Sequence, residues 1–208
     1  VTQPVAEEDY CLTPELTFAR GTCAAFFEEL YAGRLAGRTV RTRAVLCLKN
    51  GLIVVADRIE TDRPRRLDAL WHWHPRCTVA IDGQTVRSLD PGVGNLRITP
   101  VAGFDWAVAT VKGQEPAGIH GTMQGWYAQG YQNWEASPTS VFTAHIEGST
   151  TFAWLLLPAR GEVPPIQGEL VEDTEDAITV RLRQAGQAPL TVRLPWIGGI
   201  DAAGLTSS

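Results

Sequence analysis

"RTRAVLCLKNGLIVVADRIE", residues 41–60, contains the pattern that decides the fold. Two apolar runs, at 41–49 and 52–60, are rich in valine, leucine and isoleucine, and Asn50-Gly51 lies between them. A tight type I′ turn requires a positive φ at both central residues, which asparagine and glycine adopt more easily than other residues. The sequence therefore predicts an antiparallel hairpin that reverses at Asn50-Gly51.

Runs of this kind recur along the whole chain of 208 residues. They follow one another at intervals of about 8–12 residues with turn residues between them, as in antiparallel sandwiches and barrels. Asp82-Gly83 and Glu147-Gly148-Ser149 predict two further hairpin turns. We therefore expect an all-β antiparallel sandwich of about a dozen strands, with few or no helices. We expect a single domain over 1–208, with its core at 20–160 and the strands of 161–208 packing on the same sandwich.

Charge and composition restrict the partners. The formal net charge is −5, whereas nucleic-acid binding requires a surplus of lysine and arginine. No apolar run approaches the roughly 20 residues of a membrane helix. The sequence also lacks a phosphate loop and a dinucleotide-binding motif. We therefore expect neither a nucleic-acid partner nor membrane association, and no cofactor. The basic residues nevertheless form two local groups, Arg34, Arg38, Arg41 and Arg43, and Arg63, Arg65 and Arg66.

The segment "LDALWHWH", residues 67–74, alternates tryptophan and histidine. Side chains alternate across a strand, so His72 and His74 share one side and Trp71 and Trp73 the other. Two histidines at this spacing are able to bind one zinc ion, which requires at least one further ligand. The alternatives are a sugar-contacting role, or ordinary polar neighbours of a core strand. The candidates for a third metal ligand are His120, His145, Asp57 and Asp82.

The segment "GWYAQGYQNW", residues 125–134, collects aromatic and amide side chains. Aromatic faces stack on sugar rings, and amides donate to and accept from hydroxyl groups. Its two glycines indicate a partly irregular segment, where binding residues concentrate. The segment predicts either a carbohydrate-binding surface or a hydrophobic plug that closes one end of the sandwich. The predicted carbohydrate-binding residues are Trp126, Tyr127, Tyr131, Trp134, His72 and His74.

Four segments in order resemble the C-terminal β-sandwich region of the heparinase II/III-like polysaccharide lyases. They are "RTVRTRAVLCLKNGLIVVADRIE" (38–60), "LDALWHWHP" (67–75), "GWYAQGYQNWEASP" (125–138) and "TTFAWLLLPAR" (150–160). The resemblance covers about residues 20–160 and favours strand and loop at 22–35. The spacing of Phe26, Phe27, Leu30 and Tyr31 there would by itself favour a helix. We follow the resemblance.

The resemblance implies a domain that supports or binds an acidic polysaccharide beside a helical toroid domain, of the same or an associated chain. It implies a bacterial protein that is periplasmic or secreted. Those lyases take much of their tyrosine and histidine machinery from the toroid, which this sequence lacks, so we assign no catalytic residue and expect no activity from the chain alone. One alternative is a small self-contained β-elimination lyase that uses Tyr127 or Tyr131 with His120. The other is a purely structural domain without a ligand.

Overall fold

The computed structural model describes residues 6–24, 37–115, 123–200 and 205–207. In these ranges the chain forms seventeen strands, and the one helical element is a single 3₁₀ turn, η1 (Glu7–Asp9). The all-β expectation is confirmed, with more strands than predicted. No helix in these ranges has the length and apolar character to cross a membrane. Residues 22–24 lie in a strand, as the resemblance implied, whereas 25–35 lie outside the described residues.

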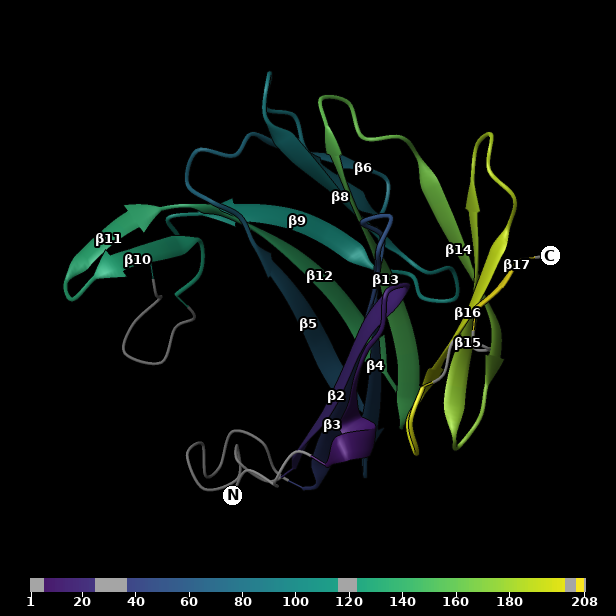
Figure 1. Ribbon diagram of the computed structural model, residues 1–208. Helices are drawn as coiled ribbons and strands as arrows, with labels where there is room; N and C mark the ends of the chain where they lie inside the picture. The colour runs from purple at the N-terminus through teal and green to yellow at the C-terminus, as the bar shows by residue number, and fades with distance from the viewer. Residues whose placement is uncertain (1–5, 25–36, 116–122, 201–204, 208) are drawn as a thin grey trace.

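An eight-stranded sheet runs through the centre of the molecule (Figure 1). All of its pairings are antiparallel, and β13 is inserted between strands that come much earlier in the chain. In spatial order the strands are β1 (Tyr10–Leu12), β2 (Leu16–Ala24), β3 (Thr39–Leu48), β4 (Ile53–Thr61), β13 (Thr150–Arg160), β8 (Gly94–Pro100), β7 (Thr85–Ser88) and β6 (Val79–Asp82).

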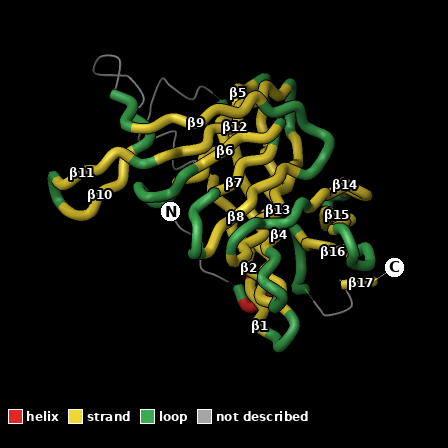
Figure 2. The backbone as a smooth tube through the Cα atoms, turned by 90° about the horizontal axis from the view of Figure 1, so that it is seen from above, coloured by secondary structure: helices red, strands yellow, loops and turns green. Residues whose placement is uncertain are grey.

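Two smaller sheets and a separate hairpin complete the fold. The three-stranded sheet consists of β5 (Arg65–His72), β12 (Pro138–Ile146) and β9 (Ala107–Lys112). The C-terminal sheet consists of β14 (Ile166–Asp173), β15 (Ala177–Gln184), β16 (Leu190–Pro195) and β17 (Leu205–Ser207). The hairpin consists of β10 (Trp126–Gly130) and β11 (Asn133–Ala136). Figures 1 and 2 place the hairpin and the C-terminal sheet on opposite sides of the molecule.

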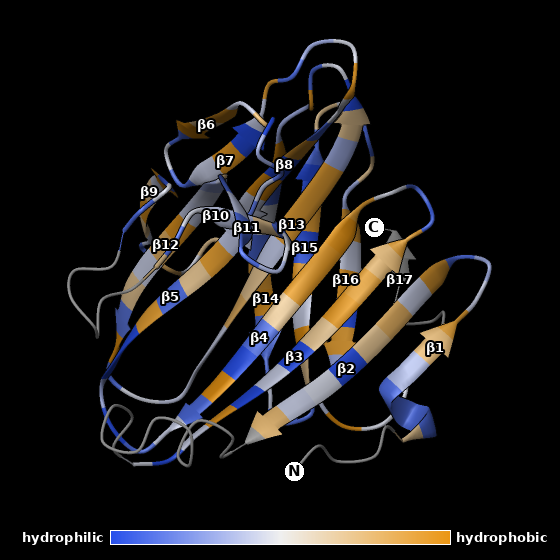
Figure 3. Ribbon diagram, turned by 90° about the vertical axis from the view of Figure 1, so that its left-hand side faces the viewer, coloured by the Kyte–Doolittle hydropathy of each residue, from blue (hydrophilic) through white to orange (hydrophobic). Residues whose placement is uncertain are grey.

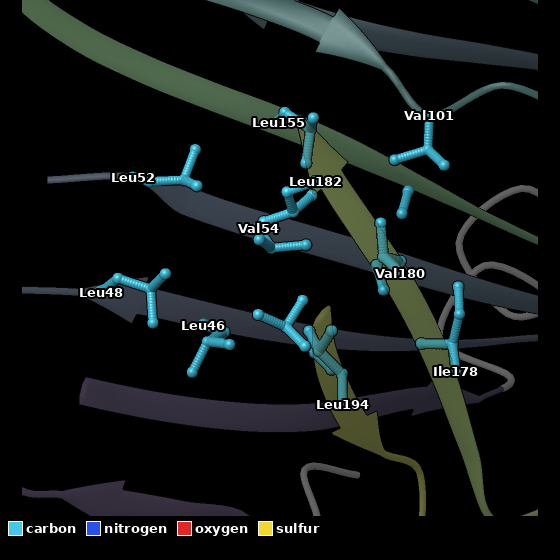
Figure 4. Packing of buried hydrophobic residues seen from close by; sticks show 14 of the residues in the cluster. Leu46, Leu48, Leu52, Val54, Val101, Leu155, Ile178, Val180, Leu182 and Leu194 are labelled. Atoms are coloured by element: carbon cyan, nitrogen blue, oxygen red, sulfur yellow. The ribbon is translucent and has the colours of Figure 1, made fainter. Parts of the chain in front are cut away.

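At β4 and β13 the central sheet is buried on both faces, so the molecule has three layers rather than two. One face packs against the C-terminal sheet through residues such as Val54, Leu155 and Leu194 (Figure 4). The other face packs against the three-stranded sheet around Trp154 and Phe142, whose rings meet edge-on with centroids 4.8 Å apart. The near-continuous apolar runs of β4 and β13 account for this, because a strand covered on both faces needs apolar residues at successive positions.

The predicted hairpin at Asn50-Gly51 is confirmed, but its turn is of another type. Of the two residues only Gly51 has a positive φ, 94°. The Gly51 N–H donates to the Leu48 carbonyl at 2.9 Å, and the Leu48 N–H donates to the Leu52 carbonyl at 2.8 Å. Lys49, Asn50 and Gly51 thus form a three-residue loop, in which a type I turn is followed by a left-handed glycine.

The segment Glu147-Gly148-Ser149 does not form the predicted hairpin turn. It joins β12 to β13, which lie in different sheets: β12 pairs with β5 and β9, and β13 with β4 and β8. The chain reverses here to pass from one layer to the next. A local turn signal gives the position of a reversal, but not whether the flanking strands pair with each other.

Candidate functional site

The β10–β11 hairpin projects from the layered body on the side of the three-stranded sheet (Figure 1). In Figure 3, which is viewed from that side, the hairpin lies in front of the body. Its strands close at the Gly130–Asn133 pair, which leaves Tyr131 and Gln132 in the turn. Gln132 has a φ of 58°, the one positive φ of a non-glycine residue in the described ranges. Tyr131 is 95% exposed. The tip therefore presents an aromatic ring directly to solvent.

The aromatic residues of the hairpin divide between its two faces. Trp126 is paired with Ala136 and Ala128 with Trp134, so both tryptophans lie on one face, because directly opposite residues of a pair point the same way. Tyr127 is paired with Glu135 and lies on the other face. The predicted binding residues thus form two aromatic surfaces rather than one platform.

The two tryptophans also differ in exposure and in contacts. Trp126 is half-buried at the base of the hairpin and donates its Nε1–H to the Gln114 carbonyl at 3.1 Å. Trp134 is 55% exposed, and its side chain makes no hydrogen bond within the described residues. Trp126 therefore ties the base of the hairpin to Gln114, and Trp134 is the more exposed of the two tryptophans.

His74 lies against the Tyr127 face of the hairpin, with ring centroids 5.8 Å apart. The Nδ1 of His74 accepts a hydrogen bond from the Arg76 backbone N–H at 3.2 Å, so the neutral ring carries its proton on Nε2. His72 ends β5, and its Nδ1 lies 3.1 Å from the Thr139 hydroxyl on β12. The structure therefore brings His74 and Tyr127 together and places His72 at the adjacent end of the three-stranded sheet.

The tryptophans that alternate with these histidines pack in the core, Trp73 buried and Trp71 partly buried. Trp73 is buried and donates its Nε1–H to the Ser140 hydroxyl at 2.9 Å. Trp71 packs edge-on against Trp154 at 5.8 Å. This packing fixes the strand end that carries His72 and His74.

Among the described residues, the structure brings no third ligand to His72 and His74 for the alternative metal assignment. The described residues contain no group of three histidine, cysteine or acidic side chains arranged to hold a metal ion. Asp57, one of the candidate third ligands, is engaged by Arg43. His120 lies outside the described residues. His145 lies on β12 opposite Arg66, at the other end of the strand from Thr139.

The same side of the molecule carries a charged patch that the site prediction did not include. Arg41, Arg43 and Asp57 lie on the face of the central sheet that packs, further along, against the three-stranded sheet. Arg43 binds Asp57, and Arg41 stands 4.0 Å from the same carboxylate. One carboxylate thus faces two guanidinium groups, of which Arg41 is 52% exposed. In the sequence, the clustering of arginines at 38–43 was the feature that could have indicated this charged patch.

The outer face of the three-stranded sheet adds a polar row on this side. Asp68 accepts a hydrogen bond from the Thr143 hydroxyl at 2.6 Å and two from Arg66 at 3.1 and 3.2 Å. Leu70, Val141 and Ala109 form the next row of the same face. Small apolar and hydrogen-bonding side chains therefore alternate along the open sheet surface near the hairpin.

No protein-family model and no curated protein matches the sequence. The fold, in contrast, is similar to that of several solved structures. The crystal structure of heparan sulfate lyase HepC from Pedobacter heparinus matches with a TM-score of 0.73 and 14% sequence identity, over 93% of this chain and 28% of the lyase. A heparinase III gene product matches with a TM-score of 0.69 and 9% identity, over 93% of this chain and 27% of that one.

A crystal structure of heparinase III matches with a TM-score of 0.64 and 11% identity, over 89% of this chain and 27% of that chain. At these identities the likeness concerns the fold alone. The chain spans just over a quarter of the length of these relatives. The resemblance inferred from the sequence is thus confirmed in three dimensions: this chain has the fold of one part of the heparinase III-type lyases.

Proposed function

We propose that this chain is the β-sandwich part of a polysaccharide lyase of the heparinase III type. In this role it contacts an acidic polysaccharide beside a helical domain of the same or an associated chain. The observation that carries the proposal is the fold match, which covers nearly all of this chain and only 28% of the heparan sulfate lyase. The match corresponds to one part of these relatives, over just over a quarter of their length.

The hairpin side of the molecule has the chemistry that an acidic sugar chain requires. Tyr131 and Trp134 offer exposed aromatic faces for stacking on sugar rings. Arg41 offers a guanidinium that is more than half exposed, and guanidinium groups bind carboxylate and sulfate through paired hydrogen bonds. A polysaccharide of this kind is met outside the cytoplasm, so the proposal includes a periplasmic or secreted location.

A second candidate is a self-contained β-elimination lyase, which the contact between His74 and Tyr127 favours. Such a reaction requires a base for the proton next to the carboxylate and a proton donor for the leaving oxygen. A tyrosine and a histidine are able to divide these roles, and the 5.8 Å between the two ring centroids places them in one region.

Titration of the chain with heparan sulfate and with other uronic-acid polysaccharides tests the two candidates together. Calorimetry reports binding, and the ultraviolet absorbance of an unsaturated uronide reports cleavage. We expect heat of binding without a rise in absorbance. A rise that the Tyr127→Phe variant abolishes would support the self-contained lyase instead, and no signal in either measurement would refute both.

The binding surface is tested with two exposed residues on different sides of the molecule. We expect Trp134→Ala to weaken binding about tenfold, the effect of losing one stacking contact of roughly 1.4 kcal/mol. Ile197→Ala is the matched control, because Ile197 is similarly exposed, at 65%, but follows β16 in the C-terminal sheet. Equal affinities of the two variants would contradict the proposed surface.

A further inference from the structure

Two arginines face each other directly on the opposite side of the central sheet from the hairpin. Arg87 on β7 is paired in register with Arg97 on β8. Their neighbours Val86 and Ile98 are buried in the cluster beneath the three-stranded sheet. Because side chains alternate across a strand, the two arginines point to the other face, toward the C-terminal sheet.

Neither guanidinium has a carboxylate partner among the residues that the structure describes. The Nε atom of each arginine is buried and has no hydrogen-bond acceptor. Arg97 is only 8% exposed, and its Nη2 donates to the Val163 carbonyl at 3.0 Å. Burial and, next, the charge of Arg87 lower the pKa of Arg97, while the charges of Asp82 and Glu162 act in the opposite direction with smaller effect.

Two facing arginines without a carboxylate partner destabilise the folded protein unless an anion binds between them. Like charges directly opposite each other destabilise a strand pair, and a buried charge without a partner carries a desolvation cost. An oxyanion would relieve both effects, because its oxygens accept hydrogen bonds from two guanidinium groups at once.

A hollow with both polar and apolar lining residues lies beside the arginine pair on the same face. Thr85 and Thr99 lie two positions away along the two strands, and their hydroxyl oxygens are 3.3 Å apart. They line a hollow of about 310 Å³ together with Gln84, Gln167 and Phe104. A sugar carrying the oxyanion would therefore find hydroxyl and amide partners next to the charge.

We propose that Arg87 and Arg97 form a binding site for an oxyanion group, as in sulfate, phosphate or carboxylate, separate from the hairpin surface. The site requires only side chains of this chain and does not depend on the proposed function. The bound oxyanion is either a free inorganic ion or the sulfate group of a sugar. In the second case the sugar itself would lie in the adjoining hollow.

The melting temperature of the full chain in sodium sulfate and in sodium chloride, at equal ionic strength, tests the site. We expect sulfate to raise the midpoint of the wild type by about 2–4 °C relative to chloride, because a ligand that binds only the folded state stabilises it. Arg87→Gln should lose most of this rise. In chloride it should melt no lower than the wild type, because the substitution removes the facing charge.

Arg193→Gln is the matched control, since it removes one positive charge from an exposed position on β16 and should keep the full rise. Sulfate also stabilises proteins generally by exclusion from their surface, and that effect is common to all three proteins. An equal rise in all three would therefore overturn the site. A sulfated disaccharide, added at the same concentration of sulfate groups, distinguishes a free ion from a sulfated sugar as the ligand. If it raises the melting temperature more than inorganic sulfate does, the hollow contributes to binding.

Discussion

Arg43 and Asp57 face each other across β3 and β4, and the guanidinium holds the carboxylate by two hydrogen bonds of 2.8 Å, from Nε to Oδ1 and from Nη2 to Oδ2. The side chain of Asp57 is only 1% exposed, whereas that of Arg43 is 38% exposed. A buried carboxylate is thus neutralised from the solvent side. Arg41, on the same face of β3, remains 4.0 Å away and is the less engaged of the two arginines.

We expect Arg43→Met to lower the free energy of unfolding by about 2–4 kcal/mol, because it leaves the buried charge of Asp57 without its main partner. Arg41→Met is the matched control and should cost less than about 1 kcal/mol, as for an exposed and distant pair. Urea denaturation of the two variants measures the difference. Equal losses would show that the arginines share the carboxylate, contrary to this assignment.

The main features of the fold were predictable from local sequence, and the stacking of the sheets was not. Asn50-Gly51 identified a true hairpin because the strands on both sides of it pair with each other. Glu147-Gly148-Ser149 carries a similar signal, but the strands beside it pair elsewhere. Pairing between distant strands depends on which apolar faces meet in three dimensions, and no local pattern contains that information.

The sequence indicated which residue types a candidate site would contain, but it did not indicate how the structure arranges them. The sequence groups Trp126, Tyr127 and Trp134 in one aromatic segment, but the pairing across the hairpin decides which of them share a face. The contact between His74 and Tyr127 joins segments about 50 residues apart in sequence, and no spacing rule connects them. The Arg87–Arg97 pair is invisible in the sequence because it depends on the register of β7 and β8.

The ion pair between Asp9 and Arg20 should make stability depend on pH in the acid range. Arg20 donates to Asp9 at 2.6 and 3.0 Å and lowers the pKa of this carboxyl, with a smaller contribution from the Ala6 backbone N–H. A carboxyl with a lowered folded-state pKa stabilises the protein above its unfolded pKa of about 3.9. This contribution is lost as the pH falls through the folded value.

We therefore expect Asp9→Asn to lower the free energy of unfolding by about 1 kcal/mol at pH 7. Its difference from the wild type should shrink as the pH falls below about 4. Urea denaturation between neutral and acid pH measures both quantities. Glu7→Gln serves as the control, because Glu7 is an exposed acidic residue of the same 3₁₀ turn. A difference for Asp9→Asn that stays constant over the whole range would contradict the assignment.

We expect alanine to be destabilising at one glycine of the hairpin region and tolerated at another. Gly125 has a φ of 79°, and a Cβ there would lie 2.7 Å from Lys112 Cα and 2.8 Å from Gly113 N. Its carbonyl also accepts hydrogen bonds from the Gly113 and Ser137 N–H groups, both at 2.8 Å. Gly130 has no atom within 4 Å of the corresponding position.

We expect Gly125→Ala to cost about 1–3 kcal/mol from backbone strain alone, and to displace the hairpin from β9. Polysaccharide affinity should fall with it, because Trp134 and Tyr131 would lose their fixed position. Gly130→Ala should leave both stability and affinity nearly unchanged. Urea denaturation and calorimetric titration of the two variants provide the comparison, and similar results for both would contradict a role of this backbone contact in holding the hairpin.

The central sheet packs against the C-terminal sheet on one face and against the three-stranded sheet on the other. We therefore propose that the C-terminal strands fold together with the rest as a single domain. Leu194 on β16 is fully buried against the central sheet, so Leu194→Ala should cost about 2–5 kcal/mol. If the layers unfold together, amide hydrogen exchange should quicken by a similar factor in β15 and in β12, although β12 does not touch Leu194's cluster. Exposed loops serve as the internal control, because their exchange does not require global opening. Faster exchange confined to β14–β16 would show instead that the C-terminal sheet opens as a unit of its own.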